Sequence, residues 1–251
     1  MKKYLVILCI TITIIFMGCS QKRDDPKLIS SFELDEPLFI QGLEVNQNKN
    51  GDKALYVGLG LEDDSRIIAF DLKKKTPFEI KEKNKENENF FGEGITFGPK
   101  GLYQLTWKNE ELYIRNPQNG EIIEKINYSG EGWGLAYDKD KNVFYFSNGT
   151  NYIYILDAET FEELDKFDVG VSNLNELEYA NGFLFSNVWQ EGFILKIDLK
   201  SKRVVKKYDF SKLCKNEKMS GDNVLNGIAH LKDNFFFISG KNWKKIYLYE
   251  L

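Results

Sequence analysis

The sequence repeats a short pattern in which an acidic residue stands between two glycines. The pattern occurs as Gly92-Glu93-Gly94 and again as Gly130-Glu131-Gly132, and a run of alternating apolar residues follows each copy. Such alternation is typical of a β-strand with one buried face. A glycine in a strand permits another backbone to approach closely. The pattern therefore predicts inner strands that crowd around a narrow channel.

Related openings occur three more times along the chain. They are Phe39-Ile40-Gln41-Gly42-Leu43-Glu44, Leu174-Asn175-Glu176-Leu177-Glu178 and Leu225-Asn226-Gly227-Ile228-Ala229. Alignment of Gly42, Gly94, Gly134, Glu176 and Gly227 gives intervals of 52, 40, 42 and 51 residues. This is the length of one four-stranded propeller blade with variable loops, so five repeats are expected.

Aromatic residues make up 14% of the chain, and no convincing helical periodicity follows the N-terminal segment, so an all-β fold is predicted. The last repeat contains only three expected strands, at 225–231, 234–239 and 244–250, while a separate strand is expected at 28–34. Pairing this strand with the last blade would remove an exposed sheet edge. The prediction is a five-bladed β-propeller over residues 28–251, closed by an N-terminal strand that completes the last blade.

The first residues have the features of a signal peptide. Lys2 and Lys3 precede an apolar run, and Gly18-Cys19 at its end resembles a bacterial lipobox. We expect a lipoprotein signal peptide at 1–18 and a lipidated tether at 19–27, with Cys19 acylated. Acyl chains would anchor the protein to a membrane of the cell envelope, in the periplasm or at the outer membrane. The alternative is a secreted protein in which Cys19 is incidental.

Composition excludes several classes of function. Cys9 would leave with the signal and Cys19 would be acylated, so Cys214 has no partner and no intrachain disulfide is expected. Loss of the signal would change the formal charge from −4 to −6, and basic residues are scattered, so no nucleic-acid partner is expected. His230 is the only histidine, which excludes a His-rich zinc site and a Ser-His-Asp triad. We expect His230 to be structural.

Strand topology predicts where a binding site would lie. Neighbouring strands of a blade are antiparallel, so the start of an inner strand lies beside the end of the second strand. One face of the propeller should therefore collect Gln41, Glu93, Glu131, Trp133, Asn175, Asn226, Trp107, Trp189, Lys241 and Trp243. A single tryptophan there could simply pack at the rim, but four together predict an aromatic pocket.

Carboxylates on the inner strands indicate proton chemistry. An acid among aromatic side chains loses hydration, which raises its pKa towards neutrality and suits it to proton transfer. Glu93 and Glu131 both fit this description. Glu176 could act directly, point outward or be salt-bridged, and Lys241 could belong to the pocket or to a solvated loop.

Eight motifs in order resemble the glutamine cyclotransferase family of plant and bacterial type, whose members are five-bladed propellers, over nearly the whole mature chain. They are Phe39-Ile40-Gln41-Gly42-Leu43, Phe91-Gly92-Glu93-Gly94, Leu102-Tyr103-Gln104-Leu105-Thr106-Trp107, Gly130-Glu131-Gly132-Trp133-Gly134, Leu174-Asn175-Glu176-Leu177-Glu178-Tyr179, Asn187-Val188-Trp189-Gln190, Leu225-Asn226-Gly227-Ile228-Ala229 and Gly240-Lys241-Asn242-Trp243. The departures are Ile40 where the family usually has threonine, Asn242 in the Lys-x-Trp gap, and a shorter loop before Leu174.

The resemblance implies cyclisation of an N-terminal glutamine of a peptide or protein to pyroglutamate, with loss of ammonia. It implies that Glu93 is the catalytic acid, and that Asn175 and Lys241 assist it. Gln41, Trp107, Trp133 and Trp189 match substrate-binding positions. No metal or other cofactor is expected to be required, and whether a structural calcium ion sits in the channel stays open. A monomer is expected.

Two other functions are weighed against this one. A propeller with this pocket could bind peptides or glycans without catalysis, although a pure binder has no need for a desolvated acid. A hydrolase of the lactonase type would hold a hard metal ion with several channel carboxylates. Sensitivity to EDTA separates this second alternative from the cyclotransferase.

Overall fold

The computed structural model describes residues 25–47, 51–61, 65–73, 76–79 and 90–251. The predicted signal peptide at 1–18, Cys19 and the tether up to residue 24 lie outside the described residues. No helix in the described ranges is long and apolar enough to cross a membrane.

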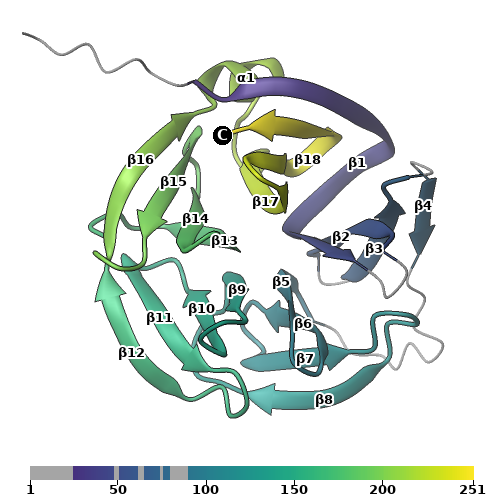
Figure 1. The fold of residues 1–251 in the computed structure, drawn as a ribbon. Helices are drawn as coiled ribbons and strands as arrows, with labels where there is room; N and C mark the ends of the chain where they lie inside the picture. Colours follow the sequence, from purple (N-terminus) through teal and green to yellow (C-terminus); the bar gives the residue numbers. More distant parts are fainter. Residues whose placement is uncertain (1–24, 48–50, 62–64, 74–75, 80–89) are drawn as a thin grey trace, which may run out of the picture.

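Strands arranged around a central axis make up most of the described chain (Figure 1). They are β1 (Lys27–Gln47), β2 (Lys53–Leu59), β3 (Arg66–Asp71), β4 (Thr76–Glu79), β5 (Gly92–Gly98), β6 (Gly101–Thr106), β7 (Glu111–Arg115), β8 (Ile122–Asn127), β9 (Gly134–Asp138), β10 (Val143–Ser147), β11 (Tyr152–Asp157), β12 (Glu163–Asp168), β13 (Leu174–Ala180), β14 (Phe183–Val188), β15 (Phe193–Asp198), β16 (Arg203–Asp209), β17 (Leu225–Lys232) and β18 (Phe235–Glu250). One short helix, α1 (Ser211–Asn216), was not expected, because six residues are too few to show a helical period.

Hydrogen bonding groups these strands into four sheets. Three sheets have four strands each, in the orders β5-β6-β7-β8, β12-β11-β10-β9 and β13-β14-β15-β16. The fourth has six strands, in the order β17-β18-β1-β2-β3-β4. The inner strands β1, β5, β9, β13 and β17 each contact the next around the axis. The all-β propeller is therefore confirmed.

The prediction of five blades closed by a separate N-terminal strand is wrong, because the propeller has four hydrogen-bonded blades. The expected strand at 28–34 is the beginning of β1, whose first part pairs with β18 and whose last part pairs with β2. Register shifts between Glu33 and Leu38 and between Ile40 and Gly42 let β1 bend from one partner to the other without ending. The first and last repeats consequently share one sheet.

Close approach of the inner strands explains the glycines of the repeats. A Cβ atom added to Gly134 would lie 2.2 Å from the carbonyl oxygen of Asn175, and one added to Gly94 would lie 2.8 Å from that of Trp133. Both distances are shorter than real Cβ contacts allow. Any side chain at these positions would push adjacent sheets apart, so the predicted crowding is confirmed.

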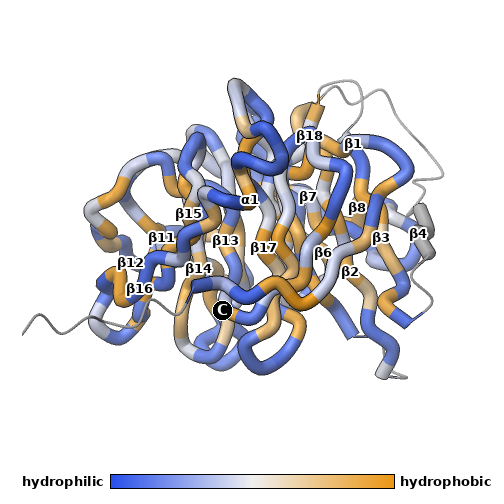
Figure 2. Tube along the Cα trace, turned by 90° about the horizontal axis from the view of Figure 1, so that it is seen from above, coloured by the Kyte–Doolittle hydropathy of each residue, from blue (hydrophilic) through white to orange (hydrophobic). Residues whose placement is uncertain are grey.

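The core lies between neighbouring sheets, where large side chains interdigitate. Figure 2 shows hydrophobic residues concentrated along the strands and hydrophilic residues in the connecting loops. Tyr103 of β6 and Phe144 of β10 are fully buried, with ring centroids 4.7 Å apart. Phe185 of β14 packs in the same way against Phe236 of β18, at 4.6 Å. Cys214 is buried and free in α1.

Replacement of Phe32 by alanine should lower the free energy of unfolding by about 2 kcal/mol, because its ring is half-buried and would leave a gap in the core. The ring of Phe32 lies 5.5 Å from that of Phe70 and 6.5 Å from that of Phe237, so it ties the first part of β1 to two other strands. Urea unfolding measures the change. Leu28 on the same stretch is 51% exposed, so Leu28→Ala is the matched control and should cost less than about 0.5 kcal/mol. Equal losses in the two variants would contradict this role for Phe32.

Candidate active site

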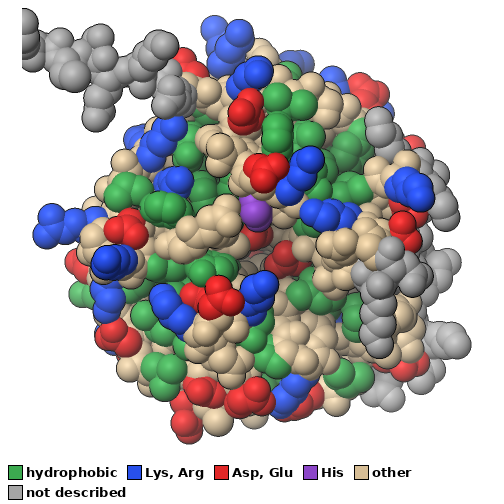
Figure 3. All heavy atoms as spheres, viewed as in Figure 1, with side chains coloured by type: hydrophobic (Ala, Val, Ile, Leu, Met, Phe, Trp, Pro, Cys, Tyr) green, Lys and Arg blue, Asp and Glu red, His purple; other side chains and the backbone are tan. Residues whose placement is uncertain are grey.

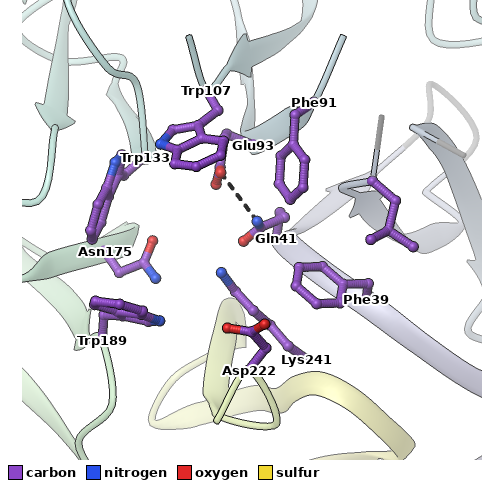
Figure 4. Close-up of a pocket in the computed structure, with 11 residues that line it drawn as sticks. Phe39, Gln41, Phe91, Glu93, Trp107, Trp133, Asn175, Trp189, Asp222 and Lys241 are labelled. Carbon is purple, nitrogen blue, oxygen red and sulfur yellow. Dashed lines mark hydrogen bonds between the residues drawn. The ribbon is translucent and has the colours of Figure 1, made fainter. Parts of the chain in front are cut away.

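One cavity of about 360 Å³ lies at the face of the propeller where the inner strands begin (Figure 4). All seven residues predicted to act in catalysis or substrate binding contribute to its wall. The full lining is Phe39, Gln41, Leu61, Phe91, Glu93, Trp107, Trp133, Asn175, Trp189, Asp222 and Lys241. The structure thus brings the predicted residues together, while their individual roles stay predictions.

Strand topology places these side chains as expected. Glu93 is the second residue of β5, and Trp107 directly follows β6, the strand that pairs with β5. Gly92 and Thr106 are register partners, so the start of one strand lies beside the end of the other. In the six-stranded sheet, Phe39 of β1 is the partner of Lys241 in β18, which brings Lys241 to the same face.

Three members of the predicted set do not line the cavity. Trp243 is only 1% exposed and packs in the core against Tyr247, so its assignment to the pocket is wrong. Asn226 is fully buried behind Gln41. Glu131 lies behind two tryptophans. Its side chain is 40% exposed, so the prediction that its carboxylate loses its hydration is wrong.

Glu176 and His230 have structural contacts. Glu176 is buried, and its two carboxylate oxygens accept hydrogen bonds from the backbone N–H groups of Leu43 at 3.2 Å and Ile228 at 2.8 Å. It therefore links three inner strands, and neither the outward nor the salt-bridged alternative holds. The ring of His230 bonds the carbonyl oxygen of Asp233 and packs on Phe236, away from the cavity lining.

Four lining residues were missed by the sequence analysis. Phe39 and Phe91 each stand two residues before a predicted polar residue, Gln41 and Glu93; Phe39 lies with Gln41 on β1, and Phe91 directly precedes β5. The period of two could have identified both phenylalanines. Leu61 and Asp222 lie outside strands, where no periodicity indicates the direction of a side chain.

Glu93 is the most perturbed acid of the cavity. Its side chain is 5% exposed, and its Oε1 accepts a hydrogen bond of 3.1 Å from Nε2 of Gln41 (Figure 4). Burial raises its pKa to about 8, the neighbouring Lys241 opposes that rise, and the charge of Glu131 adds to it. Glu93 therefore exchanges its proton in the neutral range, as predicted from its sequence context.

Lys241 belongs to the cavity, so the solvated-loop alternative is wrong. It is 8% exposed, and its ammonium group extends toward Gln41 and Glu93, with Asp222 beside it (Figure 4). Burial lowers its pKa, while the charges of Glu93 and Asp222 act in the opposite direction. The same loss of hydration thus favours the neutral form of both Glu93 and Lys241.

An aromatic wall encloses these polar groups. Oε2 of Glu131 accepts hydrogen bonds from the indole N–H groups of Trp107 at 2.9 Å and Trp133 at 3.0 Å. Trp189 packs edge-to-face on Trp133 at 5.9 Å, and Phe91 packs in the same way on Trp107 at 5.6 Å. One carboxylate oxygen therefore sets the planes of two cavity walls.

Comparison with known proteins identifies the family. The profile of the glutamine cyclotransferase family matches residues 6–251. The chain is 31% identical over 245 residues to the glutaminyl-peptide cyclotransferase of Arabidopsis thaliana, a match that covers 94% of this chain and 74% of the relative. The chain belongs to the glutamine cyclotransferase family.

One solved structure agrees with this family, and another shares the fold. The crystal structure of the glutaminyl cyclase of Myxococcus xanthus superposes with a TM-score of 0.76 at 26% identity, over 89% of this chain and 95% of that chain. A chain of a mitotic checkpoint complex has a TM-score of 0.54 at 10% identity, which shows a shared fold alone. The resemblance that the motifs suggested is confirmed.

A second group of carboxylates in this cyclotransferase-family chain lies farther along the channel. Acidic side chains gather near the axis on the face shown in Figure 3, beside the single histidine. Burial raises the pKa of Glu44 to about 7, although the hydroxyl of Thr96 donates a hydrogen bond to it at 2.8 Å. Burial, followed by the charges of Glu44 and Glu176, also raises the pKa of Glu178. Among the described residues, no three His, Cys, Asp or Glu side chains are placed to hold a metal ion together.

These acids with raised pKa values should make stability fall as pH rises. A carboxyl whose pKa is higher in the folded state binds its proton more tightly there, so its contribution is fully present below the unfolded value and is lost on approach to the folded value. For Glu44 the window runs from about 4.5 to about 7, and the loss is on the order of 2 kcal/mol. Asp157 and Asp198 have lowered pKa values and therefore titrate below this window.

Urea unfolding at pH 5, 6 and 7.5 measures this dependence, and Glu44→Gln should flatten it by removing the titrating group. Glu124, which pairs with Lys100 at the surface, supplies the matched control Glu124→Gln, which should keep the wild-type slope. A slope that is the same in wild type and Glu44→Gln would rule out the assignment to Glu44.

Proposed function

We propose that this protein is a glutaminyl-peptide cyclotransferase, which converts the N-terminal glutamine of a peptide or protein to pyroglutamate and releases ammonia. The observation that carries the proposal is a buried acid, Glu93, with a pKa of about 8 in an aromatic cavity. Membership of the family and the similarity to the Arabidopsis enzyme support the same reaction.

The reaction needs one proton to move between two nitrogen atoms. The α-amine nitrogen attacks the γ-carbonyl carbon of the same residue, and a new N–C bond closes a five-membered ring. The bond from that carbon to the amide nitrogen then breaks. The attacking nitrogen gives up a proton and the leaving nitrogen gains one, so ammonia departs and neither water nor a cofactor is consumed.

Glu93 is matched to this proton transfer. An N-terminal amine has an ordinary pKa of about 7.7 to 8.0, close to the value of about 8 for Glu93. Below that value the carboxyl is protonated and above it is ionised, so transfer between the amine and Glu93 costs little free energy near neutral pH. An acid with its ordinary pKa would be almost fully ionised at neutral pH, and so would rarely carry a proton to give to the leaving nitrogen.

Other cavity residues are assigned to positioning and charge. Oδ1 of Asn175 is buried and has no hydrogen-bond partner among the described residues, so it can accept an N–H from the substrate. The Lys241 ammonium can stabilise the oxyanion that forms on the γ-carbonyl. The tryptophans keep water from the reacting carbon and hold the flexible glutamine side chain in a folded conformation.

The other candidate functions fit less well. A protein that only binds peptides or glycans would not need a buried acid with a raised pKa, which costs stability without improving affinity. The described residues also lack the carboxylate cluster that a hard-metal hydrolase requires. If the cyclotransferase assignment is right, EDTA should leave turnover unchanged.

Glu93→Gln keeps the size of the side chain but cannot exchange a proton. The kcat for ammonia release from a Gln-initiated dipeptide should therefore fall by about 10²- to 10⁴-fold, with little change in KM. Glu131→Gln is the matched control, because its amide oxygen can still accept both indole N–H bonds, and its kcat should stay within about threefold of wild type. Retention of more than about a tenth of wild-type kcat by Glu93→Gln would sink the assignment.

We also infer attachment to a membrane of the cell envelope through acyl chains on Cys19, with the propeller as a monomer. Support comes from Gly18-Cys19 at the end of a short apolar run. Wild-type protein should partition into the detergent phase, and Cys19→Ser should stay in the aqueous phase. Equal partitioning of the two proteins would refute the anchor.

A further inference from the structure

Asn226 lies directly behind the catalytic cavity without lining it. It is the second residue of β17 and is fully buried. Its Nδ2 lies 3.1 Å from the carbonyl oxygen of Ile40, 3.2 Å from that of Gln41 and 3.4 Å from Oε1 of the Gln41 side chain. One amide group thus contacts both the backbone of β1 and the side chain that reaches Glu93.

These contacts fix the orientation of the Asn226 amide. Rotation of the group by half a turn would place Oδ1 against three oxygen atoms, none of which can donate a hydrogen bond. In the observed orientation Oδ1 has no partner in the described part of the chain, which is itself unfavourable in a buried site. The hydrogen bonds that Nδ2 of Asn226 donates to Ile40 and Gln41 therefore outweigh the cost of leaving Oδ1 without a partner.

The fixed amide of Asn226 in turn fixes that of Gln41. Oε1 of Gln41 faces the Asn226 donor, so Nε2 of Gln41 faces Glu93 and donates to its Oε1 at 3.1 Å (Figure 4). An Oε1 that carried the proton would be a weaker acceptor for this N–H group. The hydrogen bond from Gln41 therefore favours Oε2 as the oxygen that carries the proton of the neutral acid.

We propose that Asn226 is a positioning residue that acts through Gln41 to keep Oε1 of Glu93 an acceptor, so that Oε2 carries the proton from the α-amine to the leaving nitrogen. The proposal rests on the proposed cyclotransferase function. It assigns one oxygen of the catalytic carboxyl to orientation and the other to chemistry.

Loss of Asn226 has a specific consequence. Gln41 would be free to turn its own oxygen toward Glu93 and to accept a hydrogen bond from the protonated carboxyl. This second orientation stabilises the protonated form and directs its proton away from the substrate. Proton transfer should slow, and the pKa of Glu93 should rise, while substrate binding by the aromatic wall is unaffected.

Asn226→Ala tests the proposal through kinetics and pH. We expect kcat to fall about tenfold, KM to stay within about twofold, and the enzyme ionisation in the kcat/KM profile to move up by about half a unit or more. The profile also contains the ionisation of the substrate α-amine. The enzyme ionisation is recognised because its midpoint stays the same for substrates whose α-amines have different pKa values. Should Asn226→Ala fail to fold, Asn226→Ser takes its place, since its shorter hydroxyl cannot reach the Gln41 side chain.

Asn187 supplies the matched control. It is also fully buried, and its Oδ1 accepts a hydrogen bond from the N–H of Gly227 at 3.2 Å, but its side chain makes no hydrogen bond to Gln41 or Glu93. Asn187→Ala should lower thermal stability and leave the pH profile in place. A similar shift of the profile in both variants would show a general loosening of β17 and overturn the proposal.

A double-mutant cycle separates action through Gln41 from independent effects. In a Gln41→Ala background, Asn226→Ala should change kcat by less than about twofold, because the group it orients is gone. Losses in kcat that multiply in the double mutant would overturn the proposal.

An infrared titration tests the role of Asn226 without turnover. Difference spectra between a protein and its Glu93→Gln variant follow the protonation of Glu93. A titration midpoint of Glu93 that is unchanged in Asn226→Ala would also overturn the proposal. Absence of ammonia release by wild type would instead refute the proposed function, and the infrared titration still decides the role of Asn226.

Discussion

Direct contact between inner strands of different sheets is the constraint on which the rest of this structure depends. The N–H of Gly94 donates to the carbonyl oxygen of Trp133 at 2.9 Å, and the hydroxyl of Ser147 donates to that of Asn175 at 2.6 Å. Such bonds cross from one sheet to the next, and only glycine leaves room for several of them. The channel is consequently narrow, and polar side chains at its end lose most of their contact with water.

That loss of hydration raises the pKa of the cavity acid, and it also carries a penalty in free energy. A carboxyl exposed to solvent would be fully ionised at neutral pH and a poor donor to a leaving nitrogen. Burial of Glu93 moves its pKa to about 8, which makes the acid useful but leaves a polar group in an apolar surrounding. The hydrogen bond from Gln41 and the charge of Lys241 offset part of this penalty. The acid is tolerated because its partners come from a different part of the chain that the ring brings beside it.

Much of this arrangement could be predicted from strand periodicity and topology. The rule that the start of an inner strand lies beside the end of the next located seven of the eleven cavity residues, because both ends are set by backbone pairing. It failed for Trp243, which follows a bend at Asn242 with φ of 61° that turns the ring into the core. It also could not show that β1 pairs first with β18 and then with β2 as one strand, because the register shifts that allow this are not marked by any particular residue type in the sequence. Asp222 lies on a segment without regular structure and was beyond any periodic rule.

The opposite responses of Glu93 and Lys241 to burial explain why the cavity contains both. Burial raises the pKa of the acid and lowers that of the amine, so the free energies of their ionised and neutral pairs approach each other. A site with either group alone would be held in one protonation state. With both present, a small change in the surroundings, such as the entry of a peptide amine, can move the proton. In the proposed reaction the Lys241 ammonium would face the oxyanion, and the same low dielectric that makes an unpaired charge costly would make this new interaction strong.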